Sequence, residues 1–289
     1  MAAMHVESFG GGKPLVMLHG WGMHGGIWGE AVQQLAQSFR VHCVDLPGHG
    51  YSKTEKGEGG REKGEEATEK GQGARDKGED PVFPFTIHHS PFSLDSIVDD
   101  LSAQFNEPLN VCGWSLGGQI VLRWAQRHPE QVEKLVLVAS TPCFMQRADW
   151  SCAMAAEVLQ AFSDAMTQDY QATLKRFLAL QVRGSENERE LLQSLRERLF
   201  NRGEPDIAAL HGGLAILRDT DLRTQLAQIA QAALVIAGAR DTMTPPAASA
   251  YLAQALPNAR LENIAGAAHA PFLSHPEIFV KQITDFLHE

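Results

Sequence analysis

The chain has 289 residues, of which 44% are hydrophobic and 21% charged, a composition typical of a globular protein with one sizeable core. Its formal net charge of −10 argues against general affinity for nucleic acid or anionic membranes. The four cysteines show neither Cys-x-x-Cys spacing nor a histidine cluster, so no metal site and no disulfide framework are predicted. Since the N-terminus lacks a signal-peptide pattern and no long apolar stretch occurs, we expect a cytoplasmic protein without a membrane segment.

The first elements alternate between strand and helix. Apolar spacing predicts a strand over residues 14–18, a helix over 27–39 and a second strand over 41–46. The motif His19-Gly20-Trp21-Gly22 directly follows the first strand. Strand, helix and strand with short connections are typical of a parallel sheet wound with helices.

The composition changes abruptly over residues 53–80. This segment contains 16 charged residues and 7 glycines in 28, arranged as a seven-residue repeat of acid, lysine and glycine. Heptad spacing can indicate a coiled coil, but apolar a and d positions are missing. We therefore predict a disordered insertion without an assigned function, which the fold tolerates because lengthening a loop this far costs only about 1.2 kcal/mol.

The central motif is Gly113-Trp114-Ser115-Leu116-Gly117. It follows a helix predicted over residues 93–105 and a buried strand, and it opens a helix predicted over 116–128. In this context the serine of Gly-x-Ser-x-Gly lies on a strained turn that exposes its hydroxyl at the carboxyl edge of the sheet. A serine that only caps a helix would leave the flanking glycines unexplained. Ser115 is therefore the predicted nucleophile.

After a buried strand over residues 132–139, the alternation stops. Four helical patterns follow, over residues 150–166, 171–181, 187–200 and 205–217. A helical block inserted near the open end of a sheet is a natural lid. We expect an α/β core formed by residues 1–141 and 220–289, with a helical lid formed by residues 142–219.

The last part of the chain resumes the alternation. Strands are predicted over residues 233–237 and 260–264, and helices over 246–256 and 276–288. The loops that follow these two strands reach the same edge of the sheet as the nucleophile.

A serine hydroxyl needs a base, and the base needs an orienting acid. The base must come from a late loop, which selects His269, just past the last predicted strand, from twelve histidines. His275 and His128 are better explained as residues at helix termini.

Asp241 is the predicted orienting acid. It follows the penultimate strand, and the resulting chain order of Ser, Asp and His is the one that this architecture uses. Asp219 and Asp221 are rivals, but they precede that strand and look like helix-capping residues. The developing oxyanion would be bound by the backbone N–H groups of Trp21 and Leu116, each contributing about 3 kcal/mol.

At this point the chain resembles the α/β-hydrolase family over nearly its whole length, the charged insertion excepted. Within that fold it resembles the pimeloyl-[acyl-carrier-protein] methyl ester esterases of biotin synthesis. The phrases that carry this resemblance are His19-Gly20-Trp21-Gly22, Val44-Asp45-Leu46-Pro47-Gly48, Gly113-Trp114-Ser115-Leu116-Gly117-Gly118, Ala139-Ser140-Thr141-Pro142-Cys143-Phe144, Arg176-Phe177-Leu178-Ala179-Leu180-Gln181 and Gly212-Gly213-Leu214-Ala215-Ile216-Leu217. The lid phrase ending at Gln181 is the most specific of these, because lids vary more between members of the fold than the turn that carries the serine does.

The resemblance implies a serine esterase without a cofactor or metal that acts on the methyl ester carried by an acyl carrier protein. The substrate-binding residues that it implies are Trp21, Ser115, Leu116, Phe177, Leu178, Ala179, Leu180, Gln181 and His269. The expected carrier contacts are Lys175, Arg176 and Arg189. The chain departs from the family in its insertion and at Ala172 and Gln193, where arginine is expected, which weakens the expected docking more than the chemistry.

The charge of the lid agrees with an acidic partner. Residues 171–202 contain seven basic and four acidic side chains, a net of +3 in an acidic chain. The alternative is a solvated face with i,i+4 ion pairs, which these charges alone would favour, and Phe177 and Leu180 could equally form the core of the lid. We expect a monomeric esterase; the alternatives are a broad carboxylesterase of small esters and, less favoured, a ligand-binding receptor-like hydrolase.

Overall fold

A computed structural model of the protein describes residues 3–52 and 92–289, so the predicted insertion at 53–80 lies outside the described residues. The described residues form a seven-stranded sheet of order β1-β3-β2-β4-β5-β6-β7. Its strands are β1 (Val6–Phe9), β2 (Pro14–Leu18), β3 (Arg40–Val44), β4 (Leu109–Trp114), β5 (Val132–Val138), β6 (Ala232–Gly238) and β7 (Ala259–Ile264). Only β1 pairs antiparallel, so the predicted mostly parallel α/β sheet is confirmed.

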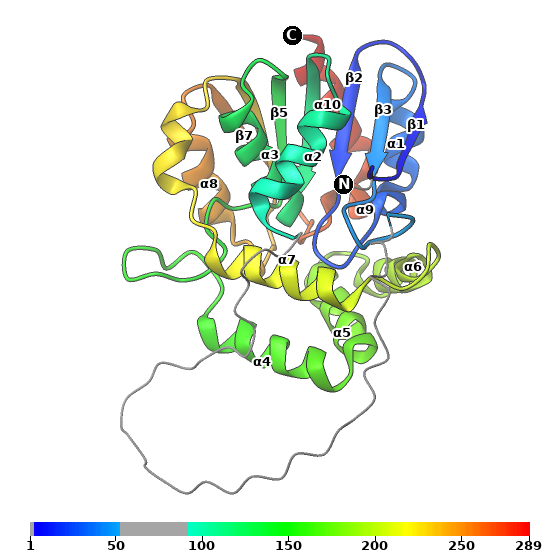
Figure 1. Cartoon of the computed structure of the whole chain (residues 1–289), viewed down its shortest axis with the longest axis vertical. Coiled ribbons are helices and arrows are strands. Elements are labelled where there is room, and N and C mark those ends of the chain that lie inside the picture. Colours follow the sequence, from blue (N-terminus) through cyan, green and yellow to red (C-terminus); the bar gives the residue numbers. More distant parts are fainter. Residues whose placement is uncertain (1–2, 53–91) are drawn as a thin grey trace, which may run out of the picture.

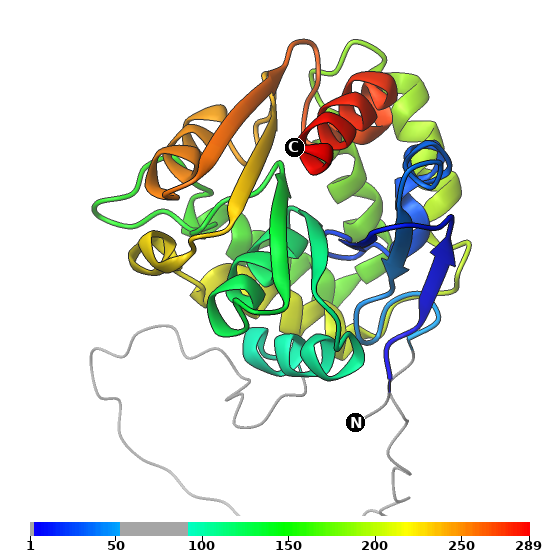
Figure 2. The ribbon, with the colours of Figure 1, turned by 90° about the horizontal axis from the view of Figure 1, so that it is seen from above.

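Helices cover both faces of the sheet. Helices α1 (Glu30–Leu35) and α10 (Pro276–His288) lie on one side, and α2 (Leu94–Gln104) and α3 (Leu116–Arg127) lie on the other (Figure 2). Helix α8 (Pro246–Ala255) packs on β6 and β7. The central strands β4 and β5 are almost wholly buried, as expected for parallel strands enclosed on two faces.

Four further helices lie together past the ends of the strands, below the sheet in Figure 1. They are α4 (Ala156–Gln168), α5 (Tyr170–Val182), α6 (Glu188–Leu199) and α7 (Ile207–Asp219). The first was expected to start at Trp150, which is wrong. Trp150 is instead buried against Cys143 and Ala248 and bridges to Arg147, which leaves this stretch irregular.

Four further differences concern short elements. The single helix expected over 27–39 is a 3-10 turn, Gly25–Trp28, followed by α1, because Gly29 at φ 55° separates them. The edge strand β1, the short helix α9 (Pro271–Ser274) and a second 3-10 turn at Arg223–Gln228 were not predicted. No helix in the described part of the chain has the length and apolarity needed to span a bilayer.

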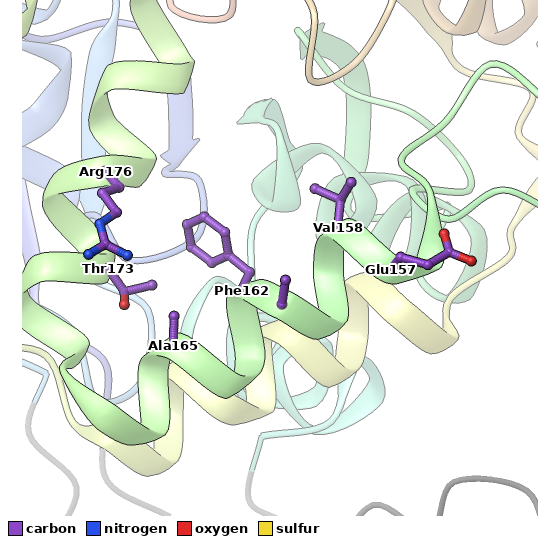
Figure 3. A pocket seen from close by; sticks show the side chains of 7 residues that line it. Glu157, Val158, Phe162, Ala165, Thr173 and Arg176 are labelled. Atoms are coloured by element: carbon purple, nitrogen blue, oxygen red, sulfur yellow. The ribbon is translucent and has the colours of Figure 1, made fainter.

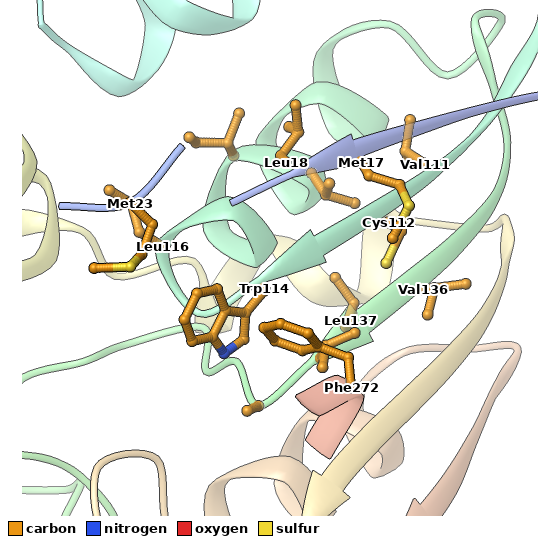
Figure 4. Close-up of a cluster of buried hydrophobic side chains, with 14 of the residues drawn as sticks. Met17, Leu18, Met23, Val111, Cys112, Trp114, Leu116, Val136, Leu137 and Phe272 are labelled. Carbon is orange, nitrogen blue, oxygen red and sulfur yellow. The ribbon is translucent and has the colours of Figure 1, made fainter. Parts of the chain in front are cut away.

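A layer of large side chains supports the carboxyl end of β4. The Trp114 indole packs edge-on against Phe272 of α9 (Figure 4), at 4.9 Å between ring centroids. The ring of Phe272 also lies 4.6 Å from that of Trp28. All three rings are buried. The residue that follows Trp114 therefore stands on a close-packed and rigid base.

Candidate active site

Ser115 occupies the sharp turn between β4 and α3. Its backbone has φ 55° and ψ −117°, a conformation that a non-glycine residue adopts only under strain. The surroundings hold it there, since its N–H donates to the carbonyl of Val138 and its carbonyl accepts from Ser140 Oγ, both at 2.9 Å. The strained turn is thus held by the end of β5, as a nucleophile elbow requires.

The glycines around Ser115 are needed for close approach. A Cβ on Gly113 would lie 2.3 Å from the carbonyl oxygen of Gly117, and one on Gly117 would lie 2.3 Å from the carbonyl oxygen of Leu18. A Cβ on Gly118 would lie 2.2 Å from Ser140 Oγ. These three positions therefore have no room for a side chain where the strand passes into the helix.

Asp241 and His269 lie in contact, as the sequence predicted. His269 Nδ1 is 2.8 Å from Asp241 Oδ2, and both side chains are only 1% exposed. Because a carboxylate only accepts, Nδ1 carries the proton and Nε2 is left with a free lone pair. His269 therefore presents a basic nitrogen, as a general base must.

The structure places His269 beside the elbow without a hydrogen bond to Ser115. The Trp114 indole N–H donates to the His269 carbonyl at 2.8 Å, which fixes the histidine loop next to the nucleophile strand. His269 Nε2 is buried and has no hydrogen-bond partner among the described residues. Catalytic hydrogen bonds are often long in unliganded enzymes and tighten when substrate binds.

Thr244 is a residue of the candidate site that the sequence did not point to. Its hydroxyl donates to Asp241 Oδ2 at 2.7 Å, and it lies 3.3 Å from His269 Nδ1. The N–H groups of Met243 and Thr244 also donate to Asp241 Oδ1, at 2.8 and 3.0 Å. The turn after β6 therefore fixes the Asp241 carboxylate with three hydrogen-bond donors. In the sequence, the only indication of these contacts is that Met243 and Thr244 follow the aspartate by two and three residues, a spacing typical of local side-chain to backbone hydrogen bonds.

The two predicted oxyanion donors lie on either side of the nucleophile. Leu116 is the first residue of α3, and Trp21 follows Gly20, whose added Cβ would lie 3.3 Å from Ser115 Cβ. Neither N–H has an acceptor within residues 3–52 and 92–289. Both are therefore free to bind a developing oxyanion.

An aromatic cluster separates Trp21 from a groove in the helical block. The ring of Phe177 lies 4.8 Å from that of Trp21, and Phe162 lies 5.5 Å from Phe177 and 6.0 Å from Trp21. Phe162 also lines a groove of about 380 Å³ between α4 and α5 (Figure 3). The groove is otherwise lined by Glu157, Val158, Ala161, Ala165, Thr173 and Arg176.

The implied substrate residues of α5 divide into different roles. Phe177 faces Trp21, whereas Leu178 is fully buried in the core. Ala179 and Leu180 are partly buried. The Gln181 carbonyl accepts the His269 N–H at 3.0 Å, so the end of α5 is bound directly to the backbone of His269.

The basic residues of the helical block also differ in role. Lys175, Arg176 and Arg189 are exposed, and none forms an ion pair within the described residues. Arg202 is different, because its guanidinium contacts the buried carboxylate of Asp45 and the partly exposed carboxylate of Glu7. The alternative reading of the lid charges was a solvated face with i,i+4 ion pairs. Within the part of the chain described, the three exposed residues form no such pairs.

The rejected candidates have other partners. Asp221 pairs with Arg223, and Asp219 with Arg218. His275 precedes α10, with its ring 2.9 Å from Ser274 Oγ.

Comparison with known proteins adds the wider context. Residues 13–276 match the family model for the alpha/beta hydrolase fold. The chain is 43% identical over 280 residues to the pimeloyl-[acyl-carrier protein] methyl ester esterase of Nitrosomonas europaea, covering 97% of this chain and 98% of that protein. It is 38% identical over 284 residues to the protein of the same name from Nitrosospira multiformis, covering 98% of each.

Solved structures show the same fold at lower identity. An esterase from Exiguobacterium antarcticum superposes with a TM-score of 0.80 at 22% identity, covering 99% of this chain and 96% of the other. A bromoperoxidase from Bacillus anthracis gives a TM-score of 0.81 at 20% identity, covering 99% and 95%.

Proposed function

Because the chain belongs to the α/β-hydrolase family and is a carboxylic ester hydrolase, we propose that it hydrolyses the methyl ester of a pimeloyl chain carried by acyl carrier protein, a step of biotin synthesis. The observation that carries this proposal is the 43% identity over 97% of the chain to an esterase of that name. The similarity extends through the helical block as well as the core.

The proposed mechanism uses Ser115, His269 and Asp241 as a triad. His269 Nε2 accepts the Ser115 proton while Ser115 Oγ attacks the ester carbonyl, and Asp241 stabilises the imidazolium that forms. The Trp21 and Leu116 N–H groups bind the oxyanion. The proton then passes from His269 to the departing methanol, and water hydrolyses the acyl-enzyme by the same route in reverse. A free carboxylate is left on the acyl chain.

We propose that residues 142–219 act as a lid on the core formed by residues 1–141 and 220–289. Ser115 is 7% and His269 only 1% exposed, so substrate needs a path past the helical block. The groove between α4 and α5 is the proposed mouth of this path, because Phe162 lines the groove and its ring also packs against that of Trp21. A long flexible arm that ends in an ester fits this path better than a bulky ester does.

The proposed partner is the acidic carrier protein, docked near Arg176 at the groove. Exposed arginines that form no ion pair within the described residues attract a negatively charged surface and speed its association. The free state of all four cysteines supports the proposed cytoplasmic location.

The experiment compares turnover of the carrier-bound methyl ester with turnover of a free short-chain ester. In Arg176→Glu and Arg189→Glu, kcat/KM on the carrier substrate should fall roughly tenfold per charge reversal, while the free ester is hydrolysed as before. Lys13→Glu is the control for charge reversal away from the groove, because Lys13 is exposed, precedes β2 at the amino ends of the strands and pairs there with Glu133.

Equal activity of all three variants on the carrier substrate would favour a broad carboxylesterase of small esters instead. Tight binding of ester without turnover would favour a ligand-binding protein. A second arm is genetic: the gene should restore growth without biotin to a strain that lacks this esterase, and failure to do so would reject the biosynthetic assignment.

A further inference from the structure

The peptide between Gly20 and Trp21 is hydrogen-bonded to the side chain of a buried histidine. His19 is fully buried, and its Nδ1 lies 2.8 Å from the Gly20 carbonyl oxygen. On the other side of the ring, Nε2 accepts the backbone N–H of Leu46 at 2.9 Å. A carbonyl only accepts and an amide N–H only donates, so the ring is neutral with its proton on Nδ1.

The strand register places this peptide between β3 and β4. Leu18 at the end of β2 pairs with Val44 of β3 on one side and with Gly113 of β4 on the other. Two residues further along each chain, Gly20 therefore lies between Leu46 and Ser115. The added Cβ of Gly20, at 3.3 Å from Ser115 Cβ, agrees with this position.

The direction of the Gly20 carbonyl sets the direction of the Trp21 N–H. The two groups belong to one trans peptide and point in opposite directions. The carbonyl points to the His19 ring, which sits on the β3 side because it also bonds Leu46. The Trp21 N–H therefore points to the β4 side, where Ser115 stands.

From this arrangement we infer that His19 is a positioning residue for the oxyanion hole: by binding the Gly20 carbonyl, it aims the Trp21 N–H at the tetrahedral intermediate formed on Ser115. The inference rests on the proposed ester hydrolysis and deepens it. His19 touches no substrate and moves no proton in the reaction.

Two properties of the surroundings suit this role. Burial, together with the nearby ring of His49 at 5.3 Å, lowers the pKa of His19 to about 3, so the donor and acceptor sides of the ring keep their identities through the neutral range. The Met23 N–H also donates to the Gly20 carbonyl, at 3.3 Å, so the loop keeps a weaker anchor when His19 is replaced. Replacement should therefore misdirect the peptide without unfolding the loop.

A pair of variants separates positioning from packing. In His19→Asn the amide nitrogen stands where Nδ1 stood and can still donate to Gly20, but Leu46 loses its acceptor. In His19→Gln the longer side chain retains an acceptor for Leu46, but no donor stands at the Nδ1 position. Each variant loses one of the two hydrogen bonds, so both should lose similar thermal stability.

The readout is hydrolysis of p-nitrophenyl butyrate, which needs no carrier protein. We expect kcat of His19→Gln to fall about 10- to 100-fold with KM within twofold, less than the loss of a whole oxyanion donor. Binding of a trifluoromethyl ketone, which forms an oxyanion on the serine, should weaken by the same factor. His19→Asn should recover most of the lost turnover. Equal losses of kcat in both variants, in step with their melting temperatures, would overturn the inference.

The tautomer offers a test that needs no activity. Nitrogen-15 NMR of the wild-type protein should show His19 with its proton on Nδ1, and a proton on Nε2 would overturn the inference. A wild-type protein that hydrolyses no ester would reject the proposed function, whereas an active wild type with fully active His19→Gln would reject this inference alone.

Discussion

At the scale of single residues, Asp241 illustrates how the site is held. Its Oδ1 receives two backbone N–H groups, and its Oδ2 is shared between the Thr244 hydroxyl and His269. This arrangement leaves the carboxylate one orientation, directed at Nδ1. A buried carboxylate with several donors is held far more firmly than one with a single partner.

The role of Thr244 can be tested with a volume-conserving change. Thr244→Val removes a hydroxyl that donates to a buried carboxylate, so we expect a loss of about 2 kcal/mol in unfolding free energy and roughly tenfold in kcat. Thr244→Ser, which retains the hydroxyl, is the control and should restore most of both. Urea unfolding and steady-state hydrolysis measure the two effects; a valine variant with wild-type values for both would show that the hydroxyl is dispensable.

The sequence predicted Ser115, Asp241 and His269, and the structure brings the last two into contact, while the roles of all three remain a prediction. Thr244 and His19 could not be assigned from sequence alone. Their partners are a carboxylate and backbone groups whose direction depends on how two loops meet, and no residue pattern encodes that direction. The motif around His19 indicated the oxyanion loop but not which atom steadies it.

At the scale of elements, the segment that follows α6 is held against the core by Arg202. Its guanidinium contacts the fully buried Asp45 at 3.2 Å, as well as Glu7 of β1. Burial by itself raises the pKa of Asp45. The N–H groups of Tyr51 and Gly25 and the charge of Arg202 outweigh burial and hold this pKa below its usual value. This part of the helical block is thus fixed to the sheet.

Arg202→Met should destabilise the protein by about 3 kcal/mol, because it leaves the Asp45 carboxylate buried without its cation. The control is Arg123→Met, which breaks a pair with the half-exposed Asp95 and should cost less than about 1 kcal/mol. Unfolding of both variants in urea gives the comparison. Similar losses of unfolding free energy in the two variants would show that the buried pair of Arg202 and Asp45 adds no more stability than an exposed pair.

The predictability of an element follows its burial. The parallel strands β2 and β5 begin where they were predicted and end within one residue of the prediction, because their apolar runs are enclosed on both faces. The edge strand β1 was missed, since two of its four residues are exposed and it lacks such a run. Its antiparallel pairing with β3 depends on a partner distant in sequence.

At the scale of the whole molecule, buried neutral histidines make stability depend on pH. Burial lowers the pKa of His19 to about 3 and that of His49 to about 4, from 6.5. Below pH 6.5 the unfolded chain binds protons that the folded chain does not, so this stability is fully present above 6.5 and is lost as pH falls toward 4 and 3.

Each histidine should contribute a slope of roughly 1.4 kcal/mol per pH unit well below pH 6.5. Replacing His49 by Asn retains a donor for the Pro47 carbonyl but removes the titrating group. Unfolding free energies at pH 7, 6 and 5 should therefore fall less steeply in His49→Asn than in the wild type. Parallel curves for the two proteins would contradict this assignment.

The central claim is that Ser115 and His269 act together, although no hydrogen bond joins them in the part of the chain that the structure describes. The most direct measurement is turnover of pimeloyl-[acyl-carrier protein] methyl ester by Ser115→Ala, His269→Ala and the double variant. If the two residues form one catalytic unit, each single variant and the double variant should all lose about six orders of magnitude in kcat. Retained hydrolysis in Ser115→Ala, or losses that add up in the double variant, would contradict the account.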